Sequence, residues 1–458
     1  MHFLYRSERA IGLNPEDKIS PAFEPYLGDT NRSGRHEAVV LYRVPHVDRP
    51  PTRRRGDRAA RRKFQAHAQA AAHREVERRI LGNSMDLDGA PAQVEPIGAG
   101  ALPVITVKAT TKTLLSLAEQ PDVIAVLPNQ RIHLIQPEGI QYQELAKQEV
   151  RNRMTWGLEQ LGISRLWEKT KGEGVSVGVL DTGVFGEHPI LQDRIAEFIM
   201  IDPLGRRINA APMFDGNGHG THVCGTIAGG ETPDGVAIGV APQAHIHMAA
   251  VLVGDATIRT LLEGIDWCIQ KGSDVINMSL GFNYYEPLFT QIFEVLIDRY
   301  EMLPVVAVGN EYQGNTSSPG NAYNALGVGA VEKMGRHRID VAFFSSGASL
   351  VFPGQEPNQI VTKPDIVAPG VQVYSAIPPV LRADGAYMFA YMDGTSMATP
   401  HVAGVAALLM AACPQVSIAE LVQAIKETAK HPAGNSRRPD NRWGYGLIQP
   451  EEAMAALA

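Results

Sequence analysis

The chain has 458 residues, of which 44% are hydrophobic and 20% charged, with 44 glycines and 31 prolines. This composition excludes a small disulfide-stapled scaffold, a disordered chain and a fibrous repeat, and at roughly 150 residues per domain it accommodates two or three domains. The net charge of −7 is divided unevenly, because residues 1–150 carry +3 and residues 151–458 carry −10.

The first residues, Met-His-Phe-Leu-Tyr-Arg, contain no basic segment followed by an apolar one, and the chain has no run of about 18 apolar residues. We therefore expect no secretion signal and no contact with a membrane. Cys224, Cys268 and Cys413 are too few for a disulfide framework and favour a reducing compartment. The expected location is cytoplasmic, or outside the cell if a leader precedes this sequence.

Residues 1–35 are rich in turn-forming residues without sustained periodicity, and we interpret them as an N-terminal extension. The next hundred residues alternate strand-like and helical patterns. Strand-like runs cover 38–42, 94–98, 103–108 and 123–127, and helical patterns cover 57–81 and 111–119. The order β-α-β-β-α-β predicts a small ferredoxin-like α+β domain over residues 36–135.

The longer of these helical patterns carries many basic residues. They are Arg53, Arg54, Arg55, Arg58, Arg61, Arg62, Lys63, Arg74, Arg78 and Arg79. We interpret them as a solvent-exposed helix face, with an acidic protein surface as the alternative. Nucleic acid is an unlikely partner, because Glu75 and Glu77 interrupt the run and its single aromatic residue is Phe64.

Residues 136–155 are polar and read as a linker with a short helix around 143–152. Beyond them, near-continuous apolar runs alternate with helical patterns. The runs cover 175–180, 247–253, 274–278, 304–308, 326–331 and 366–368, and the helices 219–228, 257–271, 288–300, 396–413 and 418–430. Strands apolar on both faces, separated by crossover helices, predict an α/β domain over 156–458 with a mostly parallel sheet covered by helices on both faces.

Three reactive side chains lie among glycines at the ends of these elements. Asp181 ends a buried strand before Thr-Gly, His219 opens a helix in the run Gly-His-Gly-Thr-His, and Ser396 opens a later helix in Gly-Thr-Ser-Met-Ala. With these segments in this order, the chain resembles the subtilisin-like serine proteases, the subtilase family, over roughly residues 156–458. The resemblance implies a subtilisin-like fold and a serine endopeptidase.

The chemistry of these residue types agrees with that resemblance. A serine hydroxyl is a weak nucleophile near neutral pH and needs an imidazole to accept its proton and a carboxylate to orient that imidazole. Taken singly, Asp181 reads as a turn former and His219 as a loop residue. Together they imply a triad in which Ser396 is the nucleophile, His219 the base and then the acid, and Asp181 the orienting carboxylate.

The resemblance also implies the substrate contacts. Asn310, in Val-Gly-Asn-Glu after a strand, would donate its amide to the oxyanion together with the Ser396 backbone amide. The family's edge strand, which pairs with the extended peptide substrate, corresponds to Ser279, Leu280 and Gly281. Two further residues are assigned to the pocket for the side chain before the scissile bond, namely Ser317 in its floor and Glu311 near its mouth. The Glu311 carboxylate would favour a basic side chain there.

No cofactor is required for this chemistry, and no metal ligand is predicted. Many subtilases bind calcium through an Asp after a His-Pro pair, but here Ile190 follows His188-Pro189, so structural calcium remains an open question. His245 and His247 share one strand face without a third ligand. Cys224 is interpreted as a small buried residue, with a thiol-sensitive activity as the alternative.

Residues 116–128 are similar to the C-terminal half of the family's inhibitor-like propeptide. That resemblance implies that the domain at 36–135 templates folding, covers the active site and leaves residues 129–136 in the cleft. Self-cleavage is then expected between His133 and Arg151. The expected partners are polypeptide substrates and this N-terminal domain. The alternative is a restrained binding or regulatory protein in which the N-terminal domain stays docked permanently.

Overall fold

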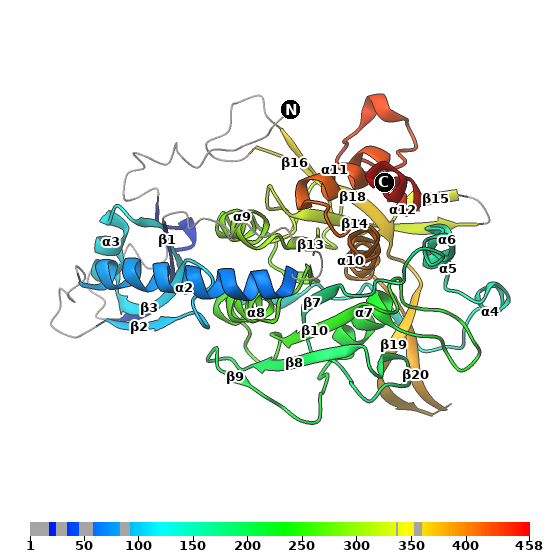
Figure 1. The fold of residues 1–458 in the computed structure, drawn as a ribbon, viewed down its shortest axis with the longest axis horizontal. Coiled ribbons are helices and arrows are strands. Elements are labelled where there is room, and N and C mark those ends of the chain that lie inside the picture. The colour runs from blue at the N-terminus through cyan, green and yellow to red at the C-terminus, as the bar shows by residue number, and fades with distance from the viewer. Residues whose placement is uncertain are drawn as a thin grey trace.

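The structure is a computed structural model that describes residues 18–23, 34–44, 58–82, 92–335, 338–351, 360–383 and 385–458. Most of the predicted extension 1–35 and Arg53, Arg54 and Arg55 lie outside these residues. A small α+β region lies at one end of the molecule and a larger α/β domain fills the rest (Figure 1).

The α+β region has the predicted β-α-β-β-α-β order, and its four-stranded antiparallel sheet has the strand order β2-β3-β1-β4. Its elements are β1 (Arg35–Tyr42), α2 (Arg58–Gly82), β2 (Gln93–Pro96), β3 (Val104–Thr110), α3 (Thr111–Glu119) and β4 (Val123–Pro128). The ferredoxin-like prediction is confirmed, and each predicted element ends within three residues of the observed one.

The apolar run in β1 is unbroken because both faces of this sheet are buried. Ala38, Val40 and Tyr42 point into a core shared with α2 and α3. Val39 and Leu41, on the opposite face, join a second core formed mainly by helices of the α/β domain. A sheet with one solvent face would show alternation instead.

The α/β domain is built on a nine-stranded sheet. In spatial order its strands are β15 (Arg338–Val341), β14 (Leu326–Met334), β13 (Leu303–Ala307), β11 (Val275–Met278), β7 (Ser176–Asp181), β10 (His245–Ala250), β8 (Ile195–Ile201) and β9 (Arg207–Ile208), with β18 (Ile366–Pro369) beside β14. All pairings are parallel except those of β15 and β9. The predicted mostly parallel sheet is confirmed.

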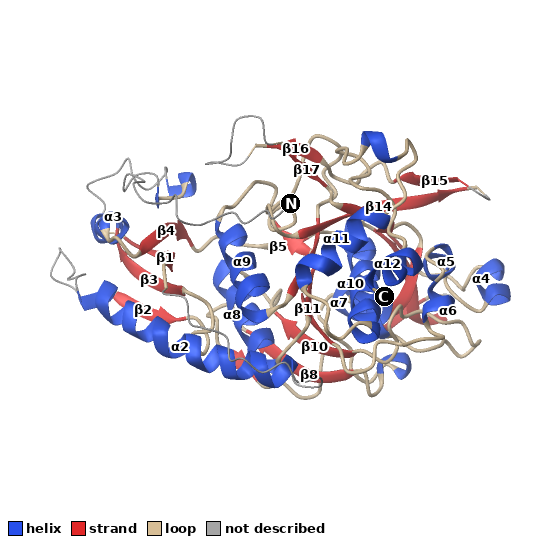
Figure 2. Ribbon diagram, turned by 45° about the horizontal axis from the view of Figure 1, so that its top comes forward, coloured by secondary structure: helices blue, strands red, loops and turns tan. Residues whose placement is uncertain are grey.

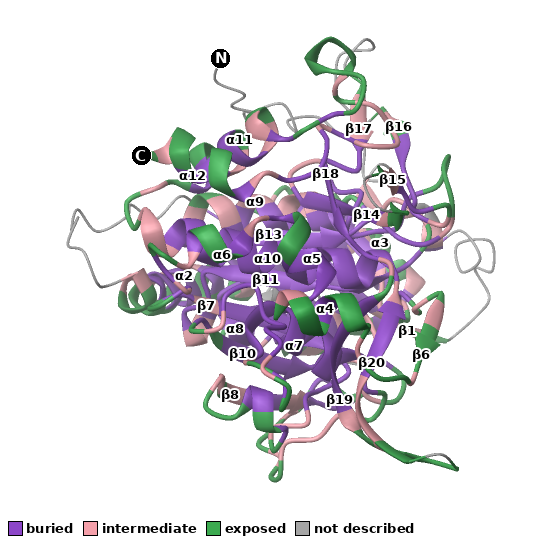
Figure 3. Ribbon diagram, turned by 90° about the vertical axis from the view of Figure 1, so that its right-hand side faces the viewer, coloured by how far each residue is buried: buried purple, intermediate pink, exposed green. Residues whose placement is uncertain are grey.

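Helices cover both faces of this sheet (Figures 1 and 2). One core cluster joins the sheet to α7 (His219–Ala228) and α10 (Thr395–Ala412), and the other joins it to α8 (Ile258–Lys271) and α9 (Leu288–Tyr300). Among the described residues, α10 alone is long and apolar enough to cross a membrane, but 89% of it is buried inside the protein. Figure 3 shows it at the buried centre of the domain, so it is a core helix.

Smaller elements complete the fold. They are α4 (Lys147–Asn152), α5 (Trp156–Gln160), α6 (Ile163–Leu166), α11 (Ile418–Thr428), α12 (Pro450–Leu457), β5 (His133–Leu134), β6 (Gly139–Gln141), β12 (Leu280–Gly281), β16 (Ala348–Leu350), β17 (Val361–Lys363), β19 (Val373–Arg382) and β20 (Gly385–Asp393). The predicted linker helix is shorter than expected, and the sequence patterns missed β8, β19 and β20. The linker also supplies β6, which extends the β19–β20 hairpin.

The basic helix α2 corrects one expectation. Lys63, Arg74, Arg78 and Arg79 are exposed as expected, whereas Arg62 is only 3% exposed and is bound to the α/β domain. Arg62 contacts Asp274 and three backbone carbonyl groups of the same chain.

Candidate active site

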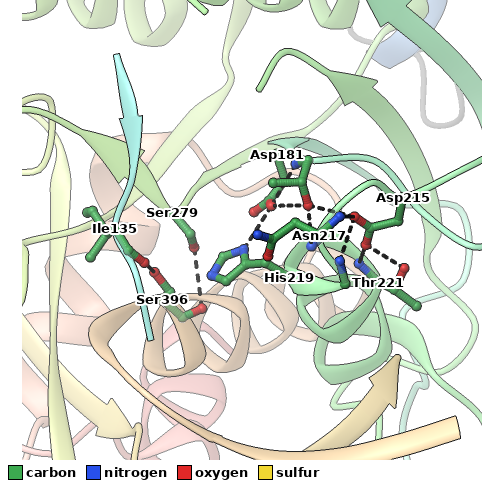
Figure 4. Close-up of polar contacts among 11 residues, drawn as sticks. Ile135, Asp181, Asp215, Asn217, His219, Thr221, Ser279 and Ser396 are labelled. Atoms are coloured by element: carbon green, nitrogen blue, oxygen red, sulfur yellow. Dashed lines mark hydrogen bonds and ion pairs between the residues drawn. The ribbon is translucent and has the colours of Figure 1, made fainter. Parts of the chain in front are cut away.

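Asp181 and His219 meet where the sheet and α7 come together. Asp181 is the last residue of β7 and His219 the first residue of α7, and both are fully buried. His219 Nδ1 lies 2.8 Å from Asp181 Oδ1. Because a carboxylate oxygen accepts, Nδ1 carries the proton and Nε2 is left as the basic nitrogen. Nε2 is buried without a hydrogen-bond partner, and the ring is turned towards Ser396 (Figure 4).

A carboxylate that the sequence analysis missed joins the two elements carrying this pair. Asp215 Oδ1 accepts from Thr182 Oγ1 at 2.8 Å and from the Gly218 amide at 2.9 Å. Asp215 Oδ2 accepts from the amide and hydroxyl of Thr221 at 2.8 and 2.6 Å. Asp215 therefore fixes the start of α7 against the residue after Asp181 (Figure 4). An acidic residue four positions before a helix-opening histidine was the available signal.

Ser396 lies in the first turn of α10, where backbone amides have no intrahelical acceptor. The side chain is fully buried, and its Oγ donates to the backbone oxygen of Ile135 at 3.1 Å. Ser279 Oγ donates to the backbone oxygen of Ser396 at 3.3 Å. The helix directs its positive end towards this serine, which suits a site where negative charge develops.

Asn310 follows β13, and its amide is oriented by α10. Asn310 Oδ1 accepts from the amide and hydroxyl of Thr395, at 3.0 and 2.9 Å. This fixes Nδ2 as the donor facing the cleft, and it donates to the backbone oxygen of Gln136 at 2.9 Å. Asn310 and Ser396 thus hold consecutive carbonyl groups of the same segment.

That segment crosses the whole site. In the part of the segment before Ile135, β5 pairs antiparallel with β12, with Leu134 opposite Leu280 and His133 opposite Gly281. The Ile135 amide then donates to the backbone oxygen of Ser279 at 3.3 Å. Downstream, β6 pairs with β20. Residues 133–141 therefore occupy the cleft as an added strand on both sides of the serine.

The predicted pocket residues lie together beside β12. Glu311 Oε2 accepts from the hydroxyls of Ser317 and Ser346, each at 2.9 Å. A Cβ at Gly309, whose φ is +109°, would lie 2.1 Å from that carboxylate, and a Cβ at Gly281 would lie 1.8 Å from the Ser318 oxygen. Glycine is required at both positions for these close approaches.

Glu311 also lines a cleft of about 540 Å³ beside the added strand. The other lining residues are Gln130, Arg131, His133, Phe282, Asn283 and Tyr284. Glu311 therefore borders open space next to β5.

The residues do not fit the calcium site discussed above. Ile190 is buried and offers no side-chain oxygen, while His188 Nε2 binds the backbone oxygen of Met388 at 2.8 Å. Among the described residues, no three histidine, cysteine or acidic side chains are placed to hold a metal ion. Burial raises the pKa of the Cys224 thiol well above its usual value, as expected for a core cysteine.

Comparisons with known proteins agree with this geometry. The family model described as the Subtilase family matches residues 172–446. Subtilisin Savinase from Lederbergia lenta is 35% identical over 302 residues, which cover 65% of this chain and 97% of that protein. Subtilisin E from Bacillus subtilis is 33% identical over 316 residues, covering 67% of this chain and 72% of that protein.

One solved structure shares the fold over almost the full length. Fervidolysin from Fervidobacterium pennivorans, a keratinolytic enzyme related to subtilisin, superimposes with a TM-score of 0.66 at 24% identity. The alignment covers 93% of this chain and 62% of the fervidolysin chain. From the family match and the identity to the subtilisins, the chain belongs to the subtilase family of serine proteases.

Proposed function

We propose that this protein is a serine endopeptidase that cleaves peptide bonds through an acyl-enzyme on Ser396, and that it is made as a proenzyme. The observation that carries the proposal is the buried 2.8 Å pair of His219 and Asp181 beside Ser396 and the Asn310 amide. A nucleophile, a base, an orienting acid and an oxyanion donor in one cleft are the parts that acyl transfer needs.

The proposed reaction uses these groups in sequence. A substrate strand pairs with β12, and Ser396 Oγ attacks the carbonyl carbon while its proton passes to His219 Nε2. The carbonyl π electrons move to the oxygen, where the Asn310 amide and the Ser396 backbone amide stabilise the negative charge. The C–N bond then breaks, His219 gives its proton to the leaving amine, and water repeats the steps on the acyl-enzyme.

The N-terminal α+β region is proposed as the inhibitor-like domain of this proenzyme. The support is that residues 133–141 fill the cleft and that Ser396 is fully buried beneath them. Substrate cannot reach β12 while β5 is paired with it. Cleavage or displacement of this segment is therefore the activating step.

The remaining proposals concern requirements and location. The reaction uses protein groups alone and needs no cofactor. Polypeptides are the substrates, and the N-terminal domain is the internal partner. We expect a cytoplasmic location, supported by the fact that all three cysteines are free thiols.

Labelling with a fluorophosphonate probe tests the activity. The parent chain is nicked with trypsin at the exposed linker residues Lys147 and Arg151, the N-terminal fragment is separated from the peptidase, and the probe is expected to label Ser396. Labelling should disappear in Ser396→Ala and fall strongly in His219→Ala, because the hydroxyl then lacks its base. A nicked parent that takes no label would support the restrained binding protein instead.

A further inference from the structure

A small cavity lies where the start of α2 meets the end of α9. The helix α2 lies across α8 and α9 (Figures 1 and 2), so the cavity has one wall from the N-terminal region and one from the α/β domain. Its volume is about 60 Å³. The described residues that line it include four arginines, Arg58, Arg61, Arg62 and Arg299, and a single carboxylate, Glu301. Positive side chains therefore dominate this cavity.

One of the four arginines is already satisfied by protein groups. Arg62 Nη1 pairs with Asp274 Oδ1 at 2.8 Å. Its Nε donates to the Tyr300 backbone oxygen at 2.7 Å, and its Nη2 donates to the Glu301 backbone oxygen at 2.9 Å. Because a guanidinium carries five N–H groups in a fixed fork, these bonds leave Arg62 little capacity for a ligand. Its role is to fix the wall of the cavity.

Two further arginines are held in place by uncharged partners. Arg58 Nη2 donates to the backbone oxygens of Pro414 and Val416, after α10, at 2.5 and 3.1 Å. Arg299 Nη1 donates to the side-chain oxygen of Gln69 at 3.0 Å. A carbonyl oxygen accepts a hydrogen bond without supplying a full negative charge. Both guanidinium groups are therefore oriented by these partners but are not neutralised by them.

Arg61 is the arginine whose donors are least satisfied. Its Nη2 lies 4.0 Å from Glu301 Oε2, which is beyond hydrogen-bonding distance. Its Nε is buried and has no hydrogen-bond partner among the described residues. An N–H removed from water without an acceptor is unfavourable, so this nitrogen points to a missing acceptor. The Arg61 and Glu301 side chains are 33% and 42% exposed, and a small solute can therefore reach them.

The electrostatics of the cavity favour an anion. Burial lowers the pKa values of Arg58 and Arg299, and at Arg58 the two neighbouring guanidinium groups lower the pKa further. Glu294 and Asp298 act on Arg299 from the same helix, but neither lines the cavity. Arginine stays protonated in proteins, so the crowded positive charge cannot be relieved by loss of a proton. A counter-ion would relieve it.

The shape and the donors of the cavity select the class of anion. The first turn of α2 contains no acidic side chain, so the positive end of this long helix adds to the charge of the arginines. The planar fork of a guanidinium matches two oxygens of a phosphate group. A volume of about 60 Å³ admits a group of a few heavy atoms. A phosphate group meets these conditions of charge, donor geometry and size.

We propose that this cavity binds a phosphate group, either as inorganic phosphate or as the phosphate of a small metabolite, and that Arg61 is the residue that holds it. Its walls come from α2 and from α9, so the bound anion joins the N-terminal region to the peptidase domain and stabilises the uncut chain. None of the residues that line it lines the cleft beside β5. The site is therefore independent of the proposed peptidase activity.

The test is calorimetric titration of the full chain carrying Ser396→Ala, in sodium chloride at ~0.15 M so that exposed charges are screened. Inorganic phosphate is expected to bind one saturable site with a Kd of about 1 mM or tighter. Arg61→Ala should weaken this binding at least about tenfold, because the charge-assisted bonds are lost. Phosphate should also raise the thermal midpoint of the parent more than that of Arg61→Ala. Adenosine monophosphate is the second probe, and tighter binding of it would identify the phosphate of a metabolite as the ligand.

Matched variants separate a built site from a general effect of charge. Arg78→Ala removes an arginine of the same helix that is 74% exposed and paired with Glu75, and it should leave the Kd unchanged. Arg61→Lys, which keeps the charge without the planar fork, should give an intermediate Kd. If Arg61→Ala does not fold, Arg61→Gln serves in its place.

Two results would overturn the proposal. Absence of saturable binding by both probes would show that the cavity is not a phosphate site. Equal Kd values for Arg61→Ala and Arg78→Ala would show that phosphate binds without using Arg61. Neither result bears on the peptidase activity, which the fluorophosphonate probe reports independently.

Discussion

At the scale of single residues, Glu311 is the residue that we propose gives the substrate pocket its negative charge. Its carboxylate is held by the hydroxyls of Ser317 and Ser346 and still lines the open cleft. The two hydroxyl donors fix the position of this carboxylate without bringing a positive charge to it. A basic substrate side chain entering the cleft therefore meets a fixed negative charge.

We expect Glu311→Gln to lower the preference for Arg or Lys before the scissile bond by about tenfold, equivalent to about 1.4 kcal/mol. The measurement is a cleavage profile of the activated enzyme on a peptide library. Glu168→Gln, a change at an exposed glutamate, is the control and should leave the profile unchanged. A parent enzyme that shows no gain for Arg or Lys would contradict the assignment.

The candidate site shows what residue patterns reveal and what they miss. Asp181, His219 and Ser396 stand in short glycine-rich segments, and their roles and that of Asn310 were implied by the resemblance to the subtilases. The position of Asp215 four residues before His219 was a signal, but its role depends on Thr182, 33 residues away, which donates a hydrogen bond to it. Such a partner is visible only when the two segments are folded together.

At the scale of elements, β6 is the main departure from the sequence prediction, because the resemblance implied a cleft segment that ends at residue 136. Residues 136–155 contain polar residues without a strand pattern, yet Gly139–Gln141 forms a strand on β20. Strands this short gain their hydrogen bonds from an existing edge and need little sequence preference of their own. The edge of the neighbouring hairpin, and not the local sequence, makes this segment extended.

The position of this segment predicts the processing bond. The Ile135 amide bonds to Ser279 and Ser396 Oγ lies 3.1 Å from the Ile135 oxygen, so Ile135–Gln136 is the bond expected to break. Cleavage one residue later is disfavoured, because Pro137 has a rigid ring on the leaving nitrogen. The purified parent should give two bands and a new N-terminus at Gln136, as read by mass spectrometry.

The control for this prediction is Ser396→Ala, which should remain a single band under the same conditions. In this structure the Asn310 amide donates its hydrogen bond to the Gln136 oxygen. Before the reaction, the Ile135 oxygen has to replace the Gln136 oxygen as the acceptor of that bond. We therefore expect self-cleavage to be slow. An active parent that stays at full length, or a new N-terminus at Pro137 or beyond Arg151, would refute the assignment.

At the scale of the whole molecule, the division of charge has a structural counterpart in the interface. Arg62 and Arg131 from the N-terminal region pair with Asp274 and Asp255. In the opposite sense, Arg259 of the peptidase pairs with Glu37 of the N-terminal region. The charges are therefore complementary pair by pair, and the +3 and −10 totals describe the sequence without identifying these contacts.

Buried histidines give the molecule a pH-dependent stability. Burial lowers the pKa of His222 to about 3 and the pKa values of His73, His247 and His401 to about 4. Between pH 4 and 6.5 the unfolded chain then binds more protons than the folded one, so stability falls as the pH is lowered. Burial raises the pKa of Glu286 to about 7 and also raises the pKa values of Glu149, Glu263, Glu294 and Asp393, and these carboxyl groups act in the opposite direction.

We expect the urea midpoint of the Ser396→Ala chain to be lower at pH 5 than at pH 7.5. Each histidine contributes up to about 1.4 kcal/mol per pH unit. His73→Gln should reduce this pH dependence, since an amide can donate to the Gly100 oxygen that His73 Nδ1 now contacts at 2.6 Å. Identical midpoints at both pH values would show that these histidines do not govern acid stability.

The sequence by itself determined the two fold classes, the order of their main elements and the residues of the candidate triad. These features are local, because hydrophobic periodicity and glycine-rich turns act over a few residues. The tertiary structure alone decided that the cleft segment continues beyond residue 136 to pair with β20, that Asp215 joins two elements, and that Arg62 is buried against α8 and α9. Each of these depends on partners distant in the chain, since helix ends and strand edges acquire donors and acceptors only when the elements meet.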